Sequence, residues 1–332
     1  MKDLRRFAII GGGAWGTALA LVVSRTGREA ILWAREREVV ESILKQRENA
    51  AFLPGVRLEP PFAVTEEFHA ALEEVEAAIL AVPAQYLRAL LTEVTRYVPP
   101  NAVLVLAAKG IVQETGALLS EAVAEALPKH PLAILSGPTF AAEVAKGLPT
   151  AVTVAARERT LAEAVAQALS GRTFRPYASD DPVGVEIGGA VKNVIAIACG
   201  IVVGRGLGEN ARAALLTRGL AEMTRLGLAK GARAETFMGL SGLGDLALTC
   251  GSIQSRNMSL GIALGEGKTL AEVLGARRSV AEGVTTAPAV VSLAKRLKVE
   301  MPISSAVDAV LHRRADIDKT IAALLSRPLK AE

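Results

Sequence analysis

The chain is poor in cysteine, histidine and aromatic residues. Its 332 residues include 2 Cys and 3 His, and 4% are aromatic. Two cysteines, Cys199 and Cys250, exclude a disulfide framework and a four-cysteine zinc site. The histidines are dispersed and lie outside every polar motif described below, at His69, His130 and His312. This distribution disfavours a histidine metal site and a histidine-based dehydrogenase mechanism, so we expect no metal.

Charge of one sign is also lacking. The net charge is +4, from 26 Arg and 12 Lys against 34 acidic residues, and no stretch forms a dense basic tract. Dispersed basic charge with few aromatic residues disfavours a nucleic-acid partner. Hydrophobic residues make up 51% and charged residues 22% of the chain, which excludes a disordered or low-complexity protein.

No long apolar run is free of charge. The first apolar run, Phe7–Gly13, is too short for the core of a secretory signal. The most membrane-like stretch, Val183–Val203, contains Glu186, Lys192 and Asn193 in its first half. Charges at that depth of a bilayer are costly, so a buried helix fits better than a membrane span. With free cysteines and no export signal, we expect a cytoplasmic protein.

The first half of the chain alternates short β-rich runs with helical patterns, and several of the runs are continuously apolar. Such runs are typical of strands covered on both faces of a parallel sheet. The predicted strands are Phe7–Ile10, Ala30–Ala34, Ala77–Val82, Ala102–Ala107, Leu132–Ser136, Ala151–Ala155 and Phe174–Tyr177. Alternating β and α elements predict an α/β fold with a Rossmann-type, doubly wound, mostly parallel sheet.

The pattern changes near residue 180. Asp180 or Asp181 can cap a long helix with Pro182 in its first position. Helical periodicity dominates from there on, with turns expected at Gly204–Gly208, Gly227–Gly231 and Gly239–Gly244. We therefore predict an α/β dinucleotide-binding domain over residues 1–179 and an all-helical substrate domain over residues 180–332.

A glycine-rich turn follows the first predicted strand. Residues 11–17, GGGAWGT, fit the pattern G-x-G-x-x-G and open a predicted helix. Gly11 permits the tight turn, Gly13 lets the backbone approach a pyrophosphate, and Gly16 lets helix and strand pack closely. The helix N-terminus then offers free N–H groups to phosphate. An ordinary glycine-rich turn is the alternative.

The end of the second predicted strand bears on cofactor choice. NAD-selective folds place an acidic residue there to bind ribose hydroxyls, whereas this chain has Ala34 followed by Arg35. A guanidinium suits a 2′-phosphate, so we predict that NADPH is accepted. Glu36 can still reach a ribose, and Arg35 and Arg37 can instead be solvated charges at a helix start.

Two lysines stand out near the expected ligand edge. Lys109 ends a buried strand, where the alternative is a surface lysine. Lys192 lies in an otherwise small and apolar helix, where a buried ammonium needs partners. A lysine so placed can exchange a proton with a carbonyl oxygen during hydride transfer, or it can simply pair structurally.

Polar loops of the helical half can complete a site. Asp245 follows a flexible turn, and Ser255, Arg256 and Asn257 offer the hydroxyl, guanidinium and amide donors that a phosphate ester requires. Each also has a simple helix-cap interpretation. The P-loop-like Gly265–Thr269 lacks the first glycine, and Thr269 with Glu272 is better interpreted as a capping box.

Eight segments, in order and in both predicted domains, resemble the bacterial NAD(P)-dependent glycerol-3-phosphate dehydrogenases. They are GGGAWGTALA at 11–20, LWAR at 32–35, AAKGI at 107–111, LSGPTFAAEVA at 135–145, VEIGGAVKNVIAIACGI at 185–201, GLSGLGDLALTC at 239–250, SRNMSLG at 255–261 and VAEGVTTA at 280–287. The resemblance implies reduction of dihydroxyacetone phosphate to sn-glycerol 3-phosphate for phospholipid synthesis, with NADPH or NADH as cofactor.

The resemblance also implies residue roles and a homodimer. Lys192 would match the family's proton-transfer residue. The positions that would match substrate contacts, besides Lys192, are Lys109, Gly137, Thr139, Asp245, Ser255, Arg256 and Asn257. Those that would match cofactor contacts are Trp15, Arg35, Lys109, Ala141, Arg256, Val280 and Glu282. The family often has Ser at the position of Ala14, where only a backbone contact with the cofactor is retained.

Other readings remain open. A 3-hydroxyacid dehydrogenase with the same two-domain plan would need a cation for a substrate carboxylate, and the cluster of residues 255–257, with Arg256, could bind that carboxylate instead of a phosphate. A nicotinamide-sensing protein would bind NADPH without turning over a substrate. Substrate screening separates the first alternative from the phosphate-ester enzyme, and the absence of any turnover would favour the second.

Overall fold

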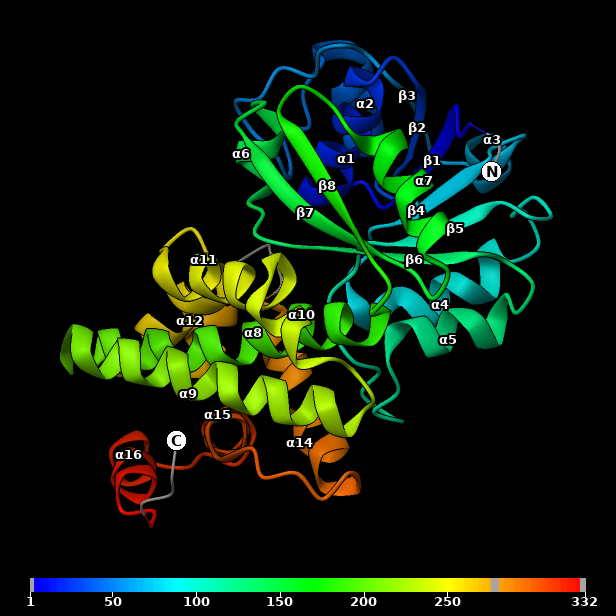
Figure 1. Cartoon of the computed structure of the whole chain (residues 1–332). Coiled ribbons are helices and arrows are strands. Elements are labelled where there is room, and N and C mark those ends of the chain that lie inside the picture. Colours follow the sequence, from blue (N-terminus) through cyan, green and yellow to red (C-terminus); the bar gives the residue numbers. More distant parts are fainter. Residues whose placement is uncertain (1–2, 276–280, 329–332) are drawn as a thin grey trace. The chain divides into compact units, whose positions relative to one another are not determined.

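The computed structural model describes residues 3–275 and 281–328. The chain forms two compact units. The first comprises Met1–Lys109 and Leu118–Glu186, and the second comprises Gly110–Ala117 and Ile187–Glu332. Figure 1 shows that the first unit is built around a sheet and the second from helices. The sequence-based limits of 1–179 and 180–332 stay a prediction.

One eight-stranded sheet organises the first unit, in the order β3-β2-β1-β4-β5-β6-β7-β8. Neighbouring strands are parallel except for the antiparallel pair of β6 and β7. The strands are β1 (Arg6–Ile10), β2 (Glu29–Trp33), β3 (Ala63–Thr65), β4 (Ala77–Leu80), β5 (Val103–Leu106), β6 (Leu132–Ser136), β7 (Thr150–Ala155) and β8 (Phe174–Ser179). The predicted doubly wound, mostly parallel sheet is confirmed.

All seven predicted strands are present, with ends that match or differ by at most two residues. The sequence analysis missed β3, which pairs with β2 at the edge of the sheet. This strand has only three residues, and none of them is buried. It therefore lacks the apolar run that reveals the inner strands.

Seven helices connect the strands of the first unit. They are α1 (Ala14–Arg25), α2 (Arg37–Gln46), α3 (Phe68–Leu72), α4 (Ala84–Val94), α5 (Leu119–Ala126), α6 (Ala141–Ala145) and α7 (Arg159–Leu169). Helix α1 packs with α6 and α7, whereas α4 packs with α5. Helices therefore lie on both faces of the sheet, as a doubly wound fold requires.

The regular elements of the second unit are all helical within its described residues, and the short segment Gly110–Ala117 is irregular. The helical elements are α8 (Pro182–Gly204, which starts in the first unit), α9 (Gly208–Ala229), α10 (Ala234–Met238), the π-helical turn η1 (Leu240–Gly244), α11 (Asp245–Gly251), α12 (Arg256–Gly265), α13 (Leu270–Gly275), α14 (Glu282–Arg296), α15 (Pro302–His312) and α16 (Ile317–Leu325). This arrangement confirms the predicted all-helical second half.

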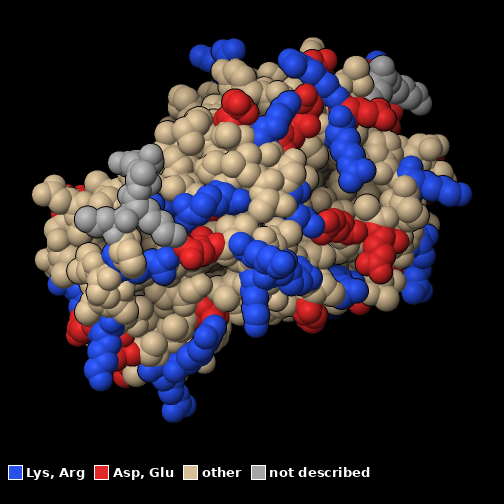
Figure 2. Space-filling model, turned by 60° about the horizontal axis from the view of Figure 1, so that its bottom comes forward, with Lys and Arg blue, Asp and Glu red and all other residues tan. Residues whose placement is uncertain are grey.

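Charged side chains of both signs share the surface. On the face shown in Figure 2, Lys and Arg are interspersed with Asp and Glu. Several pairs lie one helical turn apart, such as Arg37 with Glu41 on α2 and Arg159 with Glu163 on α7. Exposed pairs of this kind contribute little to stability, so the surface charge bears mainly on solubility.

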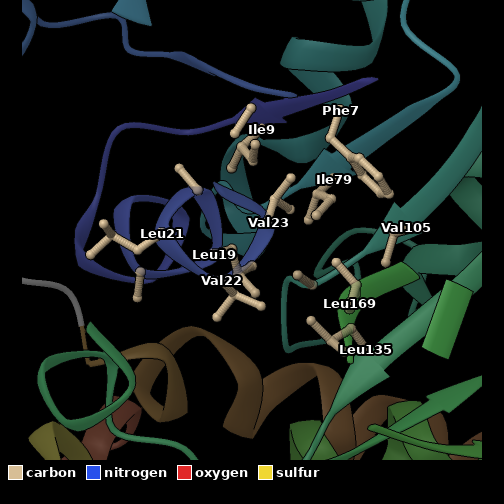
Figure 3. Close-up of a cluster of buried hydrophobic side chains, with 14 of the residues drawn as sticks. Phe7, Ile9, Leu19, Leu21, Val22, Val23, Ile79, Val105, Leu135 and Leu169 are labelled. Carbon is tan, nitrogen blue, oxygen red and sulfur yellow. The ribbon is translucent and has the colours of Figure 1, made fainter. Parts of the chain in front are cut away.

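Both faces of the inner strands are buried. Phe7 and Ile9 of β1 point into a cluster with Leu19 and Val23 of α1, as Figure 3 shows, while the alternate residues of β1 are buried on the opposite face. Side chains of a strand point alternately to its two faces. The continuous apolar runs of the sequence therefore reflect two covered faces, as in other parallel sheets.

Helix α8 starts as predicted. The Asp181 carboxylate accepts a hydrogen bond from the N–H of Gly184 at 3.0 Å, and Pro182 is the first helical residue. The helix is long and apolar enough to cross a membrane by length and composition, but 89% of its most apolar window is buried inside the molecule. This burial agrees with the prediction of a buried helix for the membrane-like stretch.

Small residues bring α8 and α12 into backbone contact. A Cβ atom on Gly261 would lie 2.1 Å from the carbonyl oxygen of Ile197, and one on Gly200 would lie 2.2 Å from that of Met258. No side chain larger than hydrogen fits at either position without movement. The two helices are therefore fixed closely to one another. Candidate site residues lie at the start of α12 and in the middle of α8.

Two of the predicted turns differ from the structure. Helix α9 continues through Gly227, which is buried against the ring of Phe237, and ends at Ala229. The predicted turn at Gly239–Gly244 is largely a π-helical turn, η1, which leads directly into α11. In both places glycine permits close packing rather than a turn. The sequence pattern does not distinguish a glycine required for packing from one required for a turn.

Candidate functional site

The glycine-rich loop lies at the carboxyl end of β1. Gly11 has a φ of +131°, and a Cβ there would lie 2.9 Å from the backbone of Ala81. A Cβ on Gly16 would lie 1.9 Å from the carbonyl oxygen of Gly11, whereas one on Gly13 would meet open space. No side chain caps α1 at Gly13. Gly11 and Gly16 therefore have packing roles, and the space at Gly13 leaves the start of α1 accessible to an anion.

A buried asparagine holds this loop. The Asn49 side-chain amide donates to the carbonyl oxygen of Gly12 and to the hydroxyl of Thr17, both at 2.8 Å. Sequence reasoning missed Asn49, because a single asparagine distant in sequence carries no local signal. Its two bonds support the loop backbone rather than offer a ligand contact.

The residues after β2 lie as their sequence suggests. A Cβ on Gly12 would lie 2.4 Å from the Cβ of Ala34, so a close approach requires small residues at both positions. The Arg35 side chain is 70% exposed, and its guanidinium lies 3.1 Å from Glu36 and over the ring of Tyr86. A guanidinium held at the edge of the sheet is therefore accessible to a phosphate.

Three predicted substrate residues meet beyond β5 and β6. The Lys109 ammonium donates to the carbonyl oxygen of Gly137 at 3.1 Å, and the Thr139 hydroxyl donates to the same oxygen at 3.3 Å. Gly137 has a φ of +148° and packs against the backbone of Val152. Ala141 follows as the first residue of α6. The loop therefore brings a cation and a hydroxyl together at the carboxyl edge of the sheet.

The second unit contains a buried ion pair. The Lys192 ammonium of α8 lies 2.5 Å from a carboxylate oxygen of Asp245 and donates to the Thr249 hydroxyl at 3.0 Å. The side chains of Lys192 and Asp245 are 7% and 0% exposed. The charged form of a buried lysine requires such partners, and they hold its Nζ in one position.

The ion pair depends on the elements around it. Asp245 begins α11 directly after the π-helical turn, and Thr249 follows one helical turn later on the same face. A Cβ on Gly188 of α8 would lie 2.3 Å from the carbonyl oxygen of Ser241, so α8 and the π-helical turn pack closely. Sequence reasoning missed Thr249, although its spacing of four residues from Asp245 was a usable signal.

An amide network joins α8, α12 and α14. The Asn257 amide donates to the side-chain oxygen of Asn193 at 2.9 Å, and its own oxygen accepts the N–H of Gly283 at 2.9 Å. Asn193 also donates to the Glu282 carboxylate at 3.4 Å. Asn193 was not singled out from the sequence, yet it links two predicted site residues, Asn257 and Glu282.

The remaining predicted residues lie at helix starts or outside the described residues. The Ser255 hydroxyl caps α12 by accepting the N–H of Met258 at 3.2 Å, which agrees with the helix-cap interpretation. Arg256 follows as an exposed first residue of that helix. Val280 lies outside the described residues.

The two cysteines are neighbours and buried. The pKa of the Cys250 thiol is raised well above its ordinary value, first by a hydrogen bond with Cys199 and then by burial. A thiol held in its neutral form is a poor nucleophile. Among residues 3–275 and 281–328, no group of three or more His, Cys, Asp and Glu side chains is arranged to hold a metal ion.

Comparison with known proteins identifies the family. The model of the NAD-dependent glycerol-3-phosphate dehydrogenase N-terminus matches residues 6–162, and that of the C-terminus matches residues 181–322. The chain belongs to the NAD-dependent glycerol-3-phosphate dehydrogenase family. The resemblance inferred from the sequence motifs is thereby confirmed.

Relatives in this dehydrogenase family are similar over their full length. The glycerol-3-phosphate dehydrogenase [NAD(P)+] of Rhodospirillum rubrum is 60% identical, with 98% of this chain and 93% of that protein covered. The corresponding protein of Parvibaculum lavamentivorans is 56% identical over 99% of this chain and 98% of its own.

Solved structures agree with the family assignment. The glycerol-3-phosphate dehydrogenase of Coxiella burnetii superposes with a TM-score of 0.94 at 39% identity, covering 98% of this chain and all of that one. A D-mandelate dehydrogenase solved with NADH has a TM-score of 0.62 at 15% identity, over 95% of this chain and 99% of its own. At that identity only the fold is shared, so the two-domain plan by itself does not select a substrate.

Proposed function

We propose that this chain interconverts dihydroxyacetone phosphate and sn-glycerol 3-phosphate by hydride transfer with NAD(P)H. The observation that carries the proposal is the buried Lys192–Asp245–Thr249 cluster in a chain of the glycerol-3-phosphate dehydrogenase family. The enzyme is thus an NAD(P)-dependent oxidoreductase, and its product is the glycerol backbone for phospholipid synthesis.

The carboxyl edge of the sheet fits a dinucleotide. The space at Gly13 would accommodate phosphate. The buried indole N–H of Trp15 has no hydrogen-bond partner in the part of the chain that the structure describes, so it is available to an acceptor. The residues that would hold the cofactor from this unit are Gly11, Gly13, Ala14, Trp15, Gly16, Arg35, Lys109 and Ala141. When bound, NAD(P)H supplies the hydride for the ketone carbon.

Lys192 supplies the proton in this proposal. Its Nζ donates to the ketone oxygen during reduction and takes the proton back in the reverse direction. Asp245 holds the ammonium by charge, and Thr249 accepts a second hydrogen bond from it, so the proton is aimed before substrate arrives. Preorganised charge of this kind also stabilises negative charge that develops on the oxygen.

The substrate phosphate is assigned to the start of α12. Arg256 offers a guanidinium, Asn257 an amide, and the helix the positive end of its dipole, with no acidic residue in its first turn. Asn257 already uses one amide hydrogen and its oxygen inside the network with Asn193 and Gly283, so its contribution is chiefly to place this helix start. Lys109, Gly137, Thr139 and Ser255 are proposed as further substrate contacts, and Val280, Glu282 and Arg256 as further cofactor contacts.

The cofactor preference rests on the end of β2. Ala34 removes the acid that would repel a 2′-phosphate, and the exposed Arg35 offers a cation for it. We therefore propose that NADPH and NADH are both accepted. We also propose that the protein is a cytoplasmic homodimer. Besides the cofactor, it binds the small phosphate substrate. Light scattering coupled to size-exclusion chromatography measures the molar mass in solution, and a mass of two chains would support the homodimer.

The deciding experiment mixes the purified protein with dihydroxyacetone phosphate and either NADPH or NADH. Loss of the reduced-cofactor absorbance with the phosphate ketone, but not with 3-oxoacids, supports the proposed reaction. Oxidation with a 3-oxoacid alone would select the hydroxyacid reading. Confirmed NADPH binding without any turnover would select a sensor. The ratio of rates with the two cofactors tests the roles of Ala34 and Arg35.

A further inference from the structure

Three buried polar atoms at the carboxyl edge of the sheet have no hydrogen-bond partner among residues 3–275 and 281–328. They are the indole nitrogen of Trp15, the side-chain oxygen Oε1 of Gln85 and the hydroxyl of Ser136. Trp15 follows β1, Gln85 follows β4, and Ser136 ends β6. Buried polar groups are nearly always paired in folded proteins, so unpaired ones at a ligand edge point to partners that a ligand supplies.

Gln85 lies at the start of α4, after the turn that contacts the glycine-rich loop. It is the second residue of the helix, and residues 81–83 form the turn between β4 and α4. A Cβ on Gly11 would lie 2.9 Å from the Ala81 carbonyl group, and one on Gly16 would lie 3.5 Å from the Ala81 Cβ. The turn after β4 and the loop after β1 are therefore in contact.

The strand order reverses at this point. From β1 the chain runs to β2 and β3 on one side, whereas β4, β5 and β6 continue on the other side. Ligands of open parallel sheets bind at such a topological switch point. Arg35 follows β2, so a dinucleotide with its adenosine on that side extends its nicotinamide half toward the end of β4.

The unpaired groups of Trp15 and Gln85 require partners of different chemistry. The Trp15 indole can only donate, and the oxygens of a pyrophosphate can accept its N–H. The Oε1 atom of Gln85 can only accept, and an ionised pyrophosphate offers it no proton. Donors occur on the nicotinamide half, in the carboxamide NH₂ and the ribose hydroxyls.

We propose that Gln85 is a further cofactor-binding residue, whose Oε1 accepts a hydrogen bond from the nicotinamide half of NAD(P)H. The inference rests on the proposed function, since it assumes that the edge of the sheet binds a nicotinamide dinucleotide. In this proposal, the start of α4 orients the reactive end of the cofactor. The glycine-rich loop and Arg35 hold the other end.

This assignment has a consequence for the free protein. A buried acceptor without a donor destabilises the fold, and an apolar residue of similar size avoids that cost. Gln85→Leu is therefore expected to leave the melting temperature of the cofactor-free protein unchanged or to raise it. The same substitution is expected to weaken cofactor binding, so the two effects have opposite signs.

The experiment measures dissociation constants by fluorescence titration, together with melting temperatures of the cofactor-free proteins. For Gln85→Leu we expect the NADPH dissociation constant to rise about tenfold. The constant for adenosine 2′,5′-bisphosphate, which lacks the nicotinamide half, should stay within about twofold, because no Gln85 contact is lost. Gln167→Leu, which changes an exposed glutamine on α7, is the matched control and should alter neither constant.

Unchanged NADPH affinity in Gln85→Leu would overturn the inference. So would a lower melting temperature with equal weakening of both ligands, since that pattern belongs to a structural glutamine. A wild-type protein that binds no NADPH would contradict the proposed function as well. NADPH binding to the wild-type protein is therefore measured before any variant is made. Weaker NADPH binding with an intact fold and intact bisphosphate binding supports the inference.

Discussion

At the scale of single residues, Lys192 combines charge, burial and a fixed position. Its partners hold it so closely that removal has two separate effects. Lys192→Ala leaves the Asp245 carboxylate buried without a counter-charge, which costs about 3–5 kcal/mol of stability. A loss of turnover in that variant therefore mixes folding with catalysis, and a second variant is needed to separate them.

Lys192→Arg makes that separation. The guanidinium keeps the charge beside Asp245 but does not release a proton at neutral pH. We expect a folded protein with NADPH affinity within about twofold of wild type and kcat at least about 100-fold lower. Single-turnover kinetics and cofactor titration check this prediction. Turnover near the wild-type rate would show that Lys192 does not transfer the proton.

Glu186 is a buried carboxyl group near the start of α8. It accepts hydrogen bonds from the N–H and the hydroxyl of Ser120 at the beginning of α5. Burial raises its pKa from 4.5 to about 7, against the opposing effect of these hydrogen bonds. Between pH 4.5 and about pH 7, Glu186 is therefore protonated in the folded state and ionised in the unfolded state.

The sign of the pH effect follows from that difference. Since the folded protein holds more protons than the unfolded chain between pH 4.5 and pH 7, this group lowers stability as the pH rises through that range. The full shift corresponds to roughly 3 kcal/mol. Glu186→Gln keeps the shape without the charge, so the variant should gain stability relative to wild type at pH 8 compared with pH 5. Denaturant unfolding at both pH values measures the gain, and equal differences at the two values would contradict the assigned pKa.

At the scale of elements, the contact of α12 with the second half of α8 positions the start of α12. Gly261→Ala places a methyl group 2.1 Å from the Ile197 carbonyl oxygen. We expect a loss of about 1–3 kcal/mol in unfolding free energy, because the helices must separate to accept it. KM for the phosphate substrate should rise as well, since α12 begins with Arg256. Thermal melts and steady-state kinetics check both effects.

The control for this prediction is Gly251→Ala. Gly251 ends α11, and a Cβ there would come no closer than 4.0 Å to another side chain. Alanine favours helix more than glycine does, so this variant should match or slightly exceed wild-type stability. Equal stability of the two variants would contradict the packing role of Gly261.

The elements also explain which parts of the fold were predictable. The inner strands have apolar runs, Asp181 and Pro182 mark the start of α8, and Thr269 with Glu272 forms the predicted capping box at 2.8 Å. Each of these signals acts within a few residues of sequence. Strand β3 and the π-helical turn depend on neighbours that are distant in the chain, so local patterns did not identify them.

The candidate site was predictable to a similar extent. Lys192 and Asp245 carried a signal because charge is unusual within small, apolar surroundings. Asn49 and Asn193 carried little, since an amide occurs in many harmless positions, and Thr249 carried only its spacing of four residues from Asp245. Their role appears only when the fold brings their partners together, as for Asn193 between Asn257 and Glu282.

At the scale of the whole molecule, the chain passes between the two compact units three times. The short segment Gly110–Ala117 belongs to the second unit, although the sequence on both sides of it belongs to the first. Arg296 of α14 donates to the carbonyl oxygens of Thr115 and Gly116, and Gln113 donates to that of Thr285 at 3.0 Å. These contacts attach the segment to the second unit.

Arg296→Ala removes most of that attachment. We expect faster amide hydrogen exchange in residues 110–117, by about 10-fold or more, because charged hydrogen bonds contribute roughly 1.5–3 kcal/mol. Hydrogen–deuterium exchange with mass spectrometry measures it. Lys295→Ala removes the adjacent cation of the same helix and is the control. Equal exchange in the two variants would show that Arg296 does not hold the segment.

This crossing segment limits how the gene can be divided. A cut near codon 180 would give a second fragment that lacks residues 110–117, with Arg296 deprived of its carbonyl partners. Residues 180–332 alone therefore do not contain the whole of the second unit. In a chimera of two related dehydrogenases, residues 110–117 should come from the parent that supplies α14, even though the flanking sequence comes from the other.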